Sequence, residues 1–317
     1  MTWAWVITLA VIGVLITVDL LLSRRAGAGG LRAAAVLSGL WVAAGLAFAA
    51  VLWVWRGQGT AGEYMAGYLL EKALSIDNIF VFVLLFSSLA VPVALQRRVL
   101  YLGVVGALVL RAGFIAAGGA LIEHFSWIFY VFGALVLLAG IRVLRAGESG
   151  APGAGVIVRG LRRLLPVSDG YEGGRFLTRS GGRLLATPLL LALIAIEATD
   201  VVFALDSIPA VFGVTRDLFV VFTSNAFAVL GLRALYFLLA GSMERFPYLR
   251  QGLAVLLAFI GVKMLISPFI HLPIALSLAV IVAVVGGAIA ASLWRDRGQP
   301  RRGQRMPSEP VREPVRE

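Results

Sequence analysis

Residues 68–79 read YLLEKALSIDNI, and residues 196–209 read IEATDVVFALDSIP. Both stretches place carboxylates inside long apolar runs. A carboxylate at the centre of a bilayer costs roughly 2.5–3.5 kcal/mol on insertion scales, so five of them facing lipid would cost on the order of 12–17 kcal/mol. We therefore expect the following acids to be paired, hydrated or bound to a cation, and to carry the function: Glu71, Asp77, Glu197, Asp200 and Asp206.

The composition is that of an integral membrane protein. Of the 317 residues, 60% are hydrophobic and 14% are charged, and the mean hydropathy is +0.93, whereas soluble domains carry about 25% charged residues. The absence of cysteine from these residues excludes disulfides, thiolate metal sites and thiol catalysis. The net charge of +11 comes mainly from arginines between and after the apolar segments, which favours contact with lipid heads and argues against a nucleic-acid partner.

Nine segments are long enough to span a hydrocarbon core of ~30 Å, at residues 3–22, 32–55, 64–90, 99–120, 126–145, 187–212, 218–240, 249–267 and 272–294. No basic residue precedes the first segment, and arginines concentrate in alternate loops and in the tail. The positive-inside rule then places the N-terminus outside and the C-terminus in the cytoplasm. We expect an all-α polytopic protein with a transporter domain at 1–295 and a disordered basic tail at 296–317.

The loop 146–185 is rich in glycine and arginine and lies on the predicted cytoplasmic side. We expect it to be a flexible connector. The alternative is that a short amphipathic helix near 156–165 lies on the membrane surface.

The chain contains an internal repeat. Glu71 and Asp77 are spaced like Asp200 and Asp206, and further matches follow, pairing Arg111-Ala with Arg233-Ala and Gly140-Ile-Arg142 with Gly261-Val-Lys263. Repeat one covers about 64–145 and repeat two about 187–267, with three spans in each. Because three is odd, the second copy enters the membrane from the opposite face, which is the inverted-repeat architecture of secondary transporters.

The two motif segments are expected to be broken or strongly tilted helices. Residues six apart lie about 120° apart on a regular helix, so Glu71 and Asp77 could not share one small ligand there. Pro209 removes a helical hydrogen-bond donor, and Asn78 could bond to backbone groups that a break sets free. Unwound backbone at this depth would add carbonyl oxygens to the acids.

The candidate ligands are all oxygen donors, which suits a hard divalent ion such as Mn²⁺, Mg²⁺ or Ca²⁺. They are Glu71, Asp77, Asn78, Glu197, Asp200 and Asp206. His124 and His271 lie at segment ends and are expected to be interfacial. We expect no enzyme activity and no prosthetic group, and the transported divalent cation is the only expected metal.

The alternative for the acids is structural: they would pair with Lys72, Arg111 and Arg233 and tie helices together. Five acids against three bases leave two acids unpaired, which favours a ligand site. We expect Arg111 and Arg233 to be counter-charges for the site. Asp19, near the basic end of its segment, is expected to pair with Arg24 or Arg25.

The two motifs, together with the run FTSNAFAVLGLRALYFL at 222–238, resemble the TerC family and within it the Alx-like branch, over about residues 5–295. The resemblance implies a bacterial inner-membrane protein related to LysE-type transporters, linked to manganese export, metal homeostasis, tellurite resistance and metal loading of exported enzymes. It also implies that Glu71, Asp77, Glu197, Asp200 and Asp206 are the functional acids. A tellurite anion would fit poorly in a site lined by five acids.

Two functions follow as hypotheses. The first is a divalent-cation transporter, with Mn²⁺ efflux by alternating access and with protons as a second ion that competes for the carboxylates. The second is a membrane scaffold in a metal- or tellurite-stress or protein-insertion complex, in which the ion pairs are structural. An intramembrane protease is disfavoured, because no GxGD context accompanies the aspartates.

Overall fold

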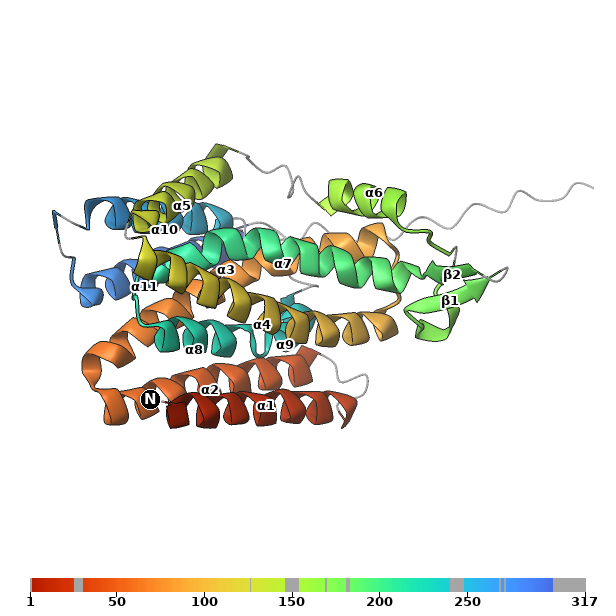
Figure 1. The fold of residues 1–317 in the computed structure, drawn as a ribbon, viewed down its shortest axis with the longest axis horizontal. Helices are drawn as coiled ribbons and strands as arrows, with labels where there is room; N and C mark the ends of the chain where they lie inside the picture. The colour runs from red at the N-terminus through yellow and green to blue at the C-terminus, as the bar shows by residue number, and fades with distance from the viewer. Residues whose placement is uncertain are drawn as a thin grey trace, which may run out of the picture.

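The computed structural model describes residues 2–25, 31–125, 127–145, 154–168, 170–180, 183–239, 248–267, 269–270 and 272–298. Within these ranges the chain is a helical bundle with one small antiparallel hairpin (Figure 1). The helices are α1 (Thr2–Arg25), α2 (Leu31–Arg56), α3 (Gln58–Ser88), α4 (Val93–His124), α5 (Ile128–Arg145), α6 (Ala154–Leu164), α7 (Pro188–Phe212), α8 (Leu218–Val229), α9 (Leu232–Leu239), α10 (Leu249–Ile266) and α11 (Ile274–Gly298). The hairpin pairs β1 (Leu177–Ser180) with β2 (Arg183–Ala186), and a short 3₁₀ turn (Glu172–Gly174) precedes it.

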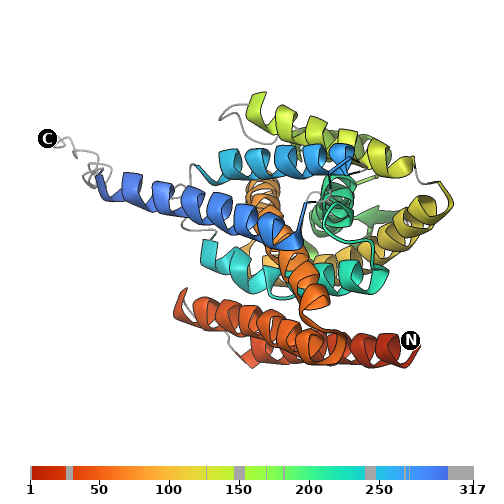
Figure 2. The same cartoon turned by 90° about the vertical axis from the view of Figure 1, so that its left-hand side faces the viewer.

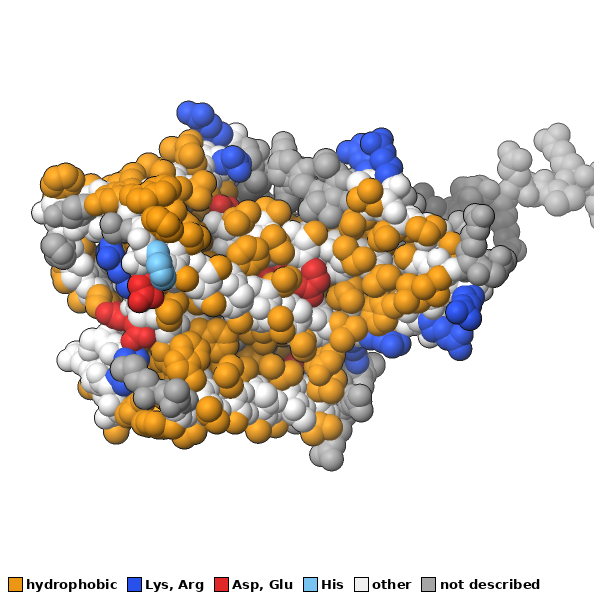
Figure 3. Space-filling view, in the orientation of Figure 1, with side chains coloured by type: hydrophobic (Ala, Val, Ile, Leu, Met, Phe, Trp, Pro, Cys, Tyr) orange, Lys and Arg blue, Asp and Glu red, His pale blue; other side chains and the backbone are white. Residues whose placement is uncertain are grey.

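The described helices confirm the membrane class. Six spans are long and apolar enough to cross a bilayer, and they correspond to α1, α2, α4, α7, α8 with α9, and α11. Helices α5 and α10 hold shorter apolar stretches, and α3 spans 31 residues but carries several charged side chains. Hydrophobic side chains cover the middle of the molecule, with most charges toward its ends (Figure 3). The count of nine spans and their orientation remain predictions.

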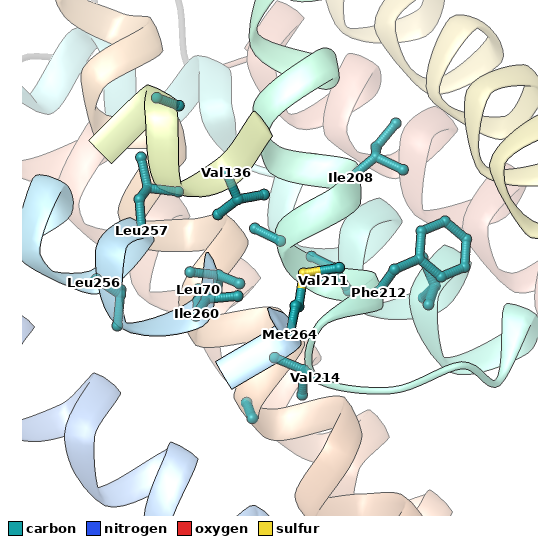
Figure 4. Close-up of a cluster of buried hydrophobic side chains, with 14 of the residues drawn as sticks. Leu70, Val136, Ile208, Val211, Phe212, Val214, Leu256, Leu257, Ile260 and Met264 are labelled. Atoms are coloured by element: carbon teal, nitrogen blue, oxygen red, sulfur yellow. The ribbon is translucent and has the colours of Figure 1, made fainter. Parts of the chain in front are cut away.

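Three helix pairs form the centre of the bundle. Helix α5 packs most extensively against α10, α3 packs along α8, and α4 packs along α7. The core between α5, α7 and α10 is apolar, and Val136, Leu257, Ile260, Val211 and Phe212 belong to one buried cluster there (Figure 4). Helices α1 and α2 form a separate layer on one side of this bundle, beside α8 (Figures 1 and 2).

The motif helices are not broken, and whether they are strongly tilted in the membrane stays a prediction. Both α3 and α7 are continuous, and Pro209 lies in the last turn of α7, where its missing donor interrupts little of the helix. The break occurs elsewhere, between α8 and α9. There Gly231 takes a φ of +81°, a conformation that side chains with a Cβ rarely adopt.

The expectation that 146–185 is a flexible connector is also wrong for the described part of this loop. It forms α6 and the β1–β2 hairpin, which supports the helical alternative. Arg98 Nη1 donates to the Gly174 carbonyl at 2.8 Å, and the Tyr171 hydroxyl donates to the Leu89 carbonyl at 2.5 Å. The segment therefore packs over one end of the bundle. Residues 146–153 and the tail beyond 298 lie outside the described residues.

Candidate functional site

Arg111, in the middle of α4, is the centre of a buried polar cluster. Its guanidinium donates two hydrogen bonds to Asp200 of α7, from Nε to Oδ2 at 3.1 Å and from Nη2 to Oδ1 at 2.9 Å. Its Nη1 donates to Glu71 Oε1 of α3, and to Asn225 Oδ1 of α8 at 3.1 Å. The exposed fractions are 2% for Arg111, 0% for Glu71, 4% for Asp200 and 1% for Asn225. One cluster thus joins one acid from each motif through four helices.

The charges of this cluster do not balance, and some of its buried polar atoms lack a hydrogen-bond partner. Two ionised carboxylates against one guanidinium leave one negative charge in excess. Among the described residues, several buried atoms around the motif helices have no hydrogen-bond partner: Glu71 Oε2, Ser75 Oγ, Ser207 Oγ and Asn225 Nδ2. An unsatisfied buried polar atom costs about 1–3 kcal/mol, and such atoms call for a water, proton or ion as partner.

Glu197 lies one helical turn before Asp200 on α7. Its carboxylate packs against two glycines of α4, Gly103 and Gly106, and a Cβ atom at position 106 would overlap it. Its Oε2 has no hydrogen-bond partner within the described part of the chain. Gly106 therefore makes room for an acid beside the Arg111 cluster.

Asp206 stands apart from this cluster. On the continuous α7 helix it lies about 120° from Asp200, it is half-buried, and its electrostatic partner is Arg142 of α5. Asn78 is buried on α3. The backbone of Asp77 belongs to α3, but its side chain lies outside what the structure describes.

The six predicted ligands therefore do not form one described cluster. The structure brings Glu71 and Asp200 together, with Glu197 next to them, and leaves Asp206 on another face of α7. Considering only the described residues, no three acidic or histidine side chains are grouped closely enough to hold a metal ion. The metal ligand set stays a prediction.

Arg233 does not meet the expectation that it is a counter-charge for the motif acids, because its printed partner is Asp19. The side chains of Arg24 and Arg25, the expected partners of Asp19, lie outside the described residues. Arg233 Nη2 contacts Asp19 Oδ2 at 2.6 Å, and Trp41 Nε1 donates to Asp19 Oδ1 at 3.0 Å. Arg233 follows the break at Gly231 by two residues, and its guanidinium joins α9 to α1.

The contacts of Lys72 also differ from those that the structural alternative predicts, in which Lys72 pairs with an acid. Its Nζ donates to two backbone carbonyls at the end of α8, Ala228 O at 2.9 Å and Leu230 O at 3.3 Å. Sequence reasoning missed this contact and the role of Asn225. The only available signals were an asparagine and a lysine within apolar runs.

Two small cavities flank the α8–α9 break. The first reaches the Arg111–Asp200 pair and is also lined by Gly103 and Leu232, and the second is lined by Asp19, Arg233, Gly231 and Tyr101. Val104 of α4 contributes to both. One cavity therefore lies beside each of two ion pairs, Arg111–Asp200 and Asp19–Arg233.

Comparisons with known proteins identify the family of the chain. The pattern of the family described as "Integral membrane protein TerC family" matches residues 56–300. The chain is 48% identical over 297 residues to the Escherichia coli (strain K12) protein named "Putative membrane-bound redox modulator Alx", covering 90% of this chain and 92% of that relative. It is 47% identical over 264 residues to an uncharacterized membrane protein of Myxococcus xanthus, covering 83% of each.

An uncharacterized membrane protein of Mycobacterium bovis is 40% identical over 317 residues, covering 93% of this chain and 80% of the relative. No solved structure matches the chain. The family match covers most of the sequence and includes both acidic motifs, the Arg111 cluster and the α8–α9 break. This multi-pass membrane protein with bacterial relatives belongs to the TerC family of integral membrane proteins.

Proposed function

We propose that this protein is a secondary transporter of a hard divalent cation, with Mn²⁺ efflux from the cytoplasm as its activity. The observation that carries this proposal is the buried cluster in which Glu71 of one motif and Asp200 of the other meet on Arg111. Carboxylate oxygens are the ligands that such ions prefer. A cluster with excess negative charge and unsatisfied oxygens, inside a bundle of apolar helices, suits a cation as substrate.

The packing supports inverted repeats. If repeat one is α3–α4–α5 and repeat two is α7–α8/α9–α10, the first helix of each repeat packs along the second helix of the other, and the third helices pair with each other. A pseudo-two-fold axis in the membrane plane would produce this reciprocal arrangement. In inverted-repeat transporters the substrate site lies at such an interface.

The acids form a path along α3 and α7, which run in opposite directions (Figure 1). Glu71 and Asp200 share one level because both contact Arg111. Six residues of helix rise about 9 Å, so the backbone of Asp77 lies about 9 Å toward the end that carries α6, and that of Asp206 about 9 Å toward the opposite end. We propose that Asp77 and Asp206 serve the two approaches to the central pair.

Arg111 holds the two carboxylates when no substrate is bound. A divalent cation that enters must take the carboxylates from Arg111, and the guanidinium then retains Asn225 as a neutral partner. Before and after the ion passes, Arg111 offsets part of the charge of the buried acids, which lowers the cost of the empty site. Alternating access of the two repeats would complete transport.

The test is flux of Mn²⁺ into vesicles reconstituted with the purified protein. We expect wild-type flux, its loss in Glu71→Gln and Asp200→Asn, and normal flux in a neutral change away from the cluster such as Gly113→Ala. Absence of flux in correctly inserted wild-type protein under a proton gradient of either sign would refute the transporter. The same measurement with Mg²⁺ and Ca²⁺ tests selectivity.

The same cluster also supports a second function, if its ion pairs are structural. A membrane scaffold with structural ion pairs would also join Glu71, Arg111 and Asp200, and two well-placed pairs could tie α3, α4 and α7 together. Such a protein gives no flux, and Glu71→Gln would make it scarce instead of inactive. Because the chain contains no cysteine, thiol redox chemistry is not the activity we propose.

A further inference from the structure

The break between α8 and α9 leaves backbone carbonyls without helical partners inside the bundle. Helix α8 ends at Val229, and its cap Leu230 leaves helical geometry with φ −56° and ψ 131°. The last four carbonyls of a helix have no donor within that helix. At membrane depth, where water is scarce, freed carbonyls need another partner. Two of them, on Ala228 and Leu230, receive hydrogen bonds from the side chain of Lys72.

The surroundings of the Lys72 ammonium resemble a cation site. Besides the carbonyls at 2.9 and 3.3 Å, the face of the Tyr68 ring lies 5.9 Å from Nζ. Carbonyl oxygens at the C-terminal end of an interrupted helix coordinate monovalent coupling ions in secondary transporters, and an aromatic face attracts cations. No described carboxylate bonds to this lysine, so backbone oxygens are its recorded hydrogen-bond acceptors.

A lysine at position 72 is also unusual for this chain. Of its 28 lysine and arginine residues only two are lysines, Lys72 and Lys263, and both lie inside apolar helices. An ammonium is a compact point charge, similar to a small monovalent ion, whereas a guanidinium is a planar fork. The position that faces the freed carbonyls thus carries the compact cation.

We propose that the α8–α9 break is a monovalent-cation site whose permanent occupant is the ammonium group of Lys72. The side chain acts as a tethered ion that holds the end of α8 and thereby positions α9 and Arg233. Lys72 follows Glu71 directly on α3, so the same helix carries the acid that meets Arg111 and the ammonium that meets the break. The proposal concerns occupancy of the break and does not depend on which ion, if any, the protein transports.

The first test restores the cation from solution. Lys72→Ala removes three carbons and the nitrogen, so n-propylammonium matches the missing piece. We expect purified Lys72→Ala to melt several degrees below wild type and to recover most of this loss with n-propylammonium chloride. Tetramethylammonium, which has no N–H donor, 1-propanol, which has no charge, and NaCl at equal ionic strength should each recover much less.

The matched control is Lys263→Ala. Lys263 is the other lysine of the chain, but its Nζ donates to the hydroxyl of Ser277 at 2.9 Å rather than to freed carbonyls. We expect no specific gain from n-propylammonium in this variant. Equal rescue of both variants, equal rescue by 1-propanol, or a Lys72→Ala variant as stable as wild type would each overturn the proposal.

A second measurement covers the case in which Lys72→Ala does not fold well. The chain has no cysteine, so Leu235→Cys on α9 provides a single labelling site. Maleimide labelling in native membranes should increase with Lys72→Gln, which keeps N–H donors but loses the charge. It should increase less with Lys72→Arg, which keeps the charge but carries it on a planar guanidinium. Labelling that is unchanged by Lys72→Gln would show that a hydrogen bond alone suffices and that no cation is needed.

Discussion

Helix α4 and the α8–α9 pair, which the proposed repeat aligns, each carry an Arg-Ala dipeptide whose buried arginine meets different partners. Helix α4 is continuous, and Arg111 points into the bundle toward Glu71 and Asp200. The other segment breaks two residues before Arg233, which turns outward to Asp19 of α1. Two residues before Arg111 stands Val109, and two residues before Arg233 stands Gly231. The difference teaches that backbone freedom at one position decides which acid a buried arginine meets.

The largest effect should come from removing the arginine of the continuous helix. Arg111→Leu strands two buried carboxylates, and breaking a buried ion pair costs about 3–5 kcal/mol. We expect the monodisperse peak in fluorescence-detected size-exclusion chromatography to collapse. Arg233→Leu strands a single acid, whose side chain is 13% exposed, and should lose less. An equal loss in both variants would remove the distinction between the two arginines.

The next largest effect should come from giving Gly231 the residue that α4 carries at the aligned position. Gly231→Val places a β-branched side chain at φ +81°, where a Cβ would lie 2.5 Å from the Trp41 Cβ. Strained backbone of this kind costs on the order of 1–3 kcal/mol before the clash is counted. The thermal midpoint should fall. The reverse change, Val109→Gly at a residue that is 68% exposed, should cost only about 1 kcal/mol as an exposed helical glycine.

A double-mutant cycle tests the partner of Arg233 at the broken helix. Asp19→Asn should destabilise the protein by about 1–3 kcal/mol, because Arg233 loses its charged acceptor in a buried position. Adding Arg233→Gln to Asp19→Asn should recover part of this loss. The free energies of unfolding of the two single variants and the double variant give the coupling. Additive losses would show that Asp19 and Arg233 do not interact.

The smallest effect concerns the space beside the Arg111 cluster. Gly106→Ala should force the Glu197 carboxylate away from α4, and we expect weaker Mn²⁺ flux with little loss of protein. Gly113→Ala, on the same helix, meets no atom within 4 Å and should be neutral or stabilising by up to about 1 kcal/mol. Comparing Gly106→Ala with Gly113→Ala separates the effect of a local clash from the general effect of an added alanine in α4. Equal flux in the two variants would exclude Glu197 from the path.

The sequence predicted the parts of the site that depend on residue type alone. Acids inside apolar runs marked Glu71 and Asp200 as buried and in need of partners, and the structure confirms Arg111 as their counter-charge. The same reasoning did not predict that Asp206 lies near Arg142 or that Arg233 meets Asp19, because the partner of a charged side chain depends on which helix face meets which neighbour. Sequence reasoning also predicted a helix break at the acidic motifs, whereas both motif helices are continuous.

The break between α8 and α9 illustrates why the position of a helix break could not be predicted from the sequence. Pro209 is a stronger local breaker than glycine, yet it sits in the last turn of α7, where the helix is about to end. Gly231 is a weak signal on its own, since glycines are frequent in membrane helices. It becomes a break because Trp41 packs on its backbone, while Lys72 and Asp19 hold the groups on either side of it.

The sequence by itself therefore determined the membrane class and the TerC family, and it predicted which acids carry the function. The membrane class and the need of buried acids for partners follow from hydropathy and from the cost of placing charge in hydrocarbon, whereas the family follows from the two motifs. Only the tertiary structure decided that Glu71 and Asp200 meet on Arg111, that Arg233 serves Asp19, and that Lys72 occupies the α8–α9 break. The physical reason is that ion pairs and freed carbonyls are satisfied by whichever groups packing brings within about 3 Å, from helices far apart in the sequence.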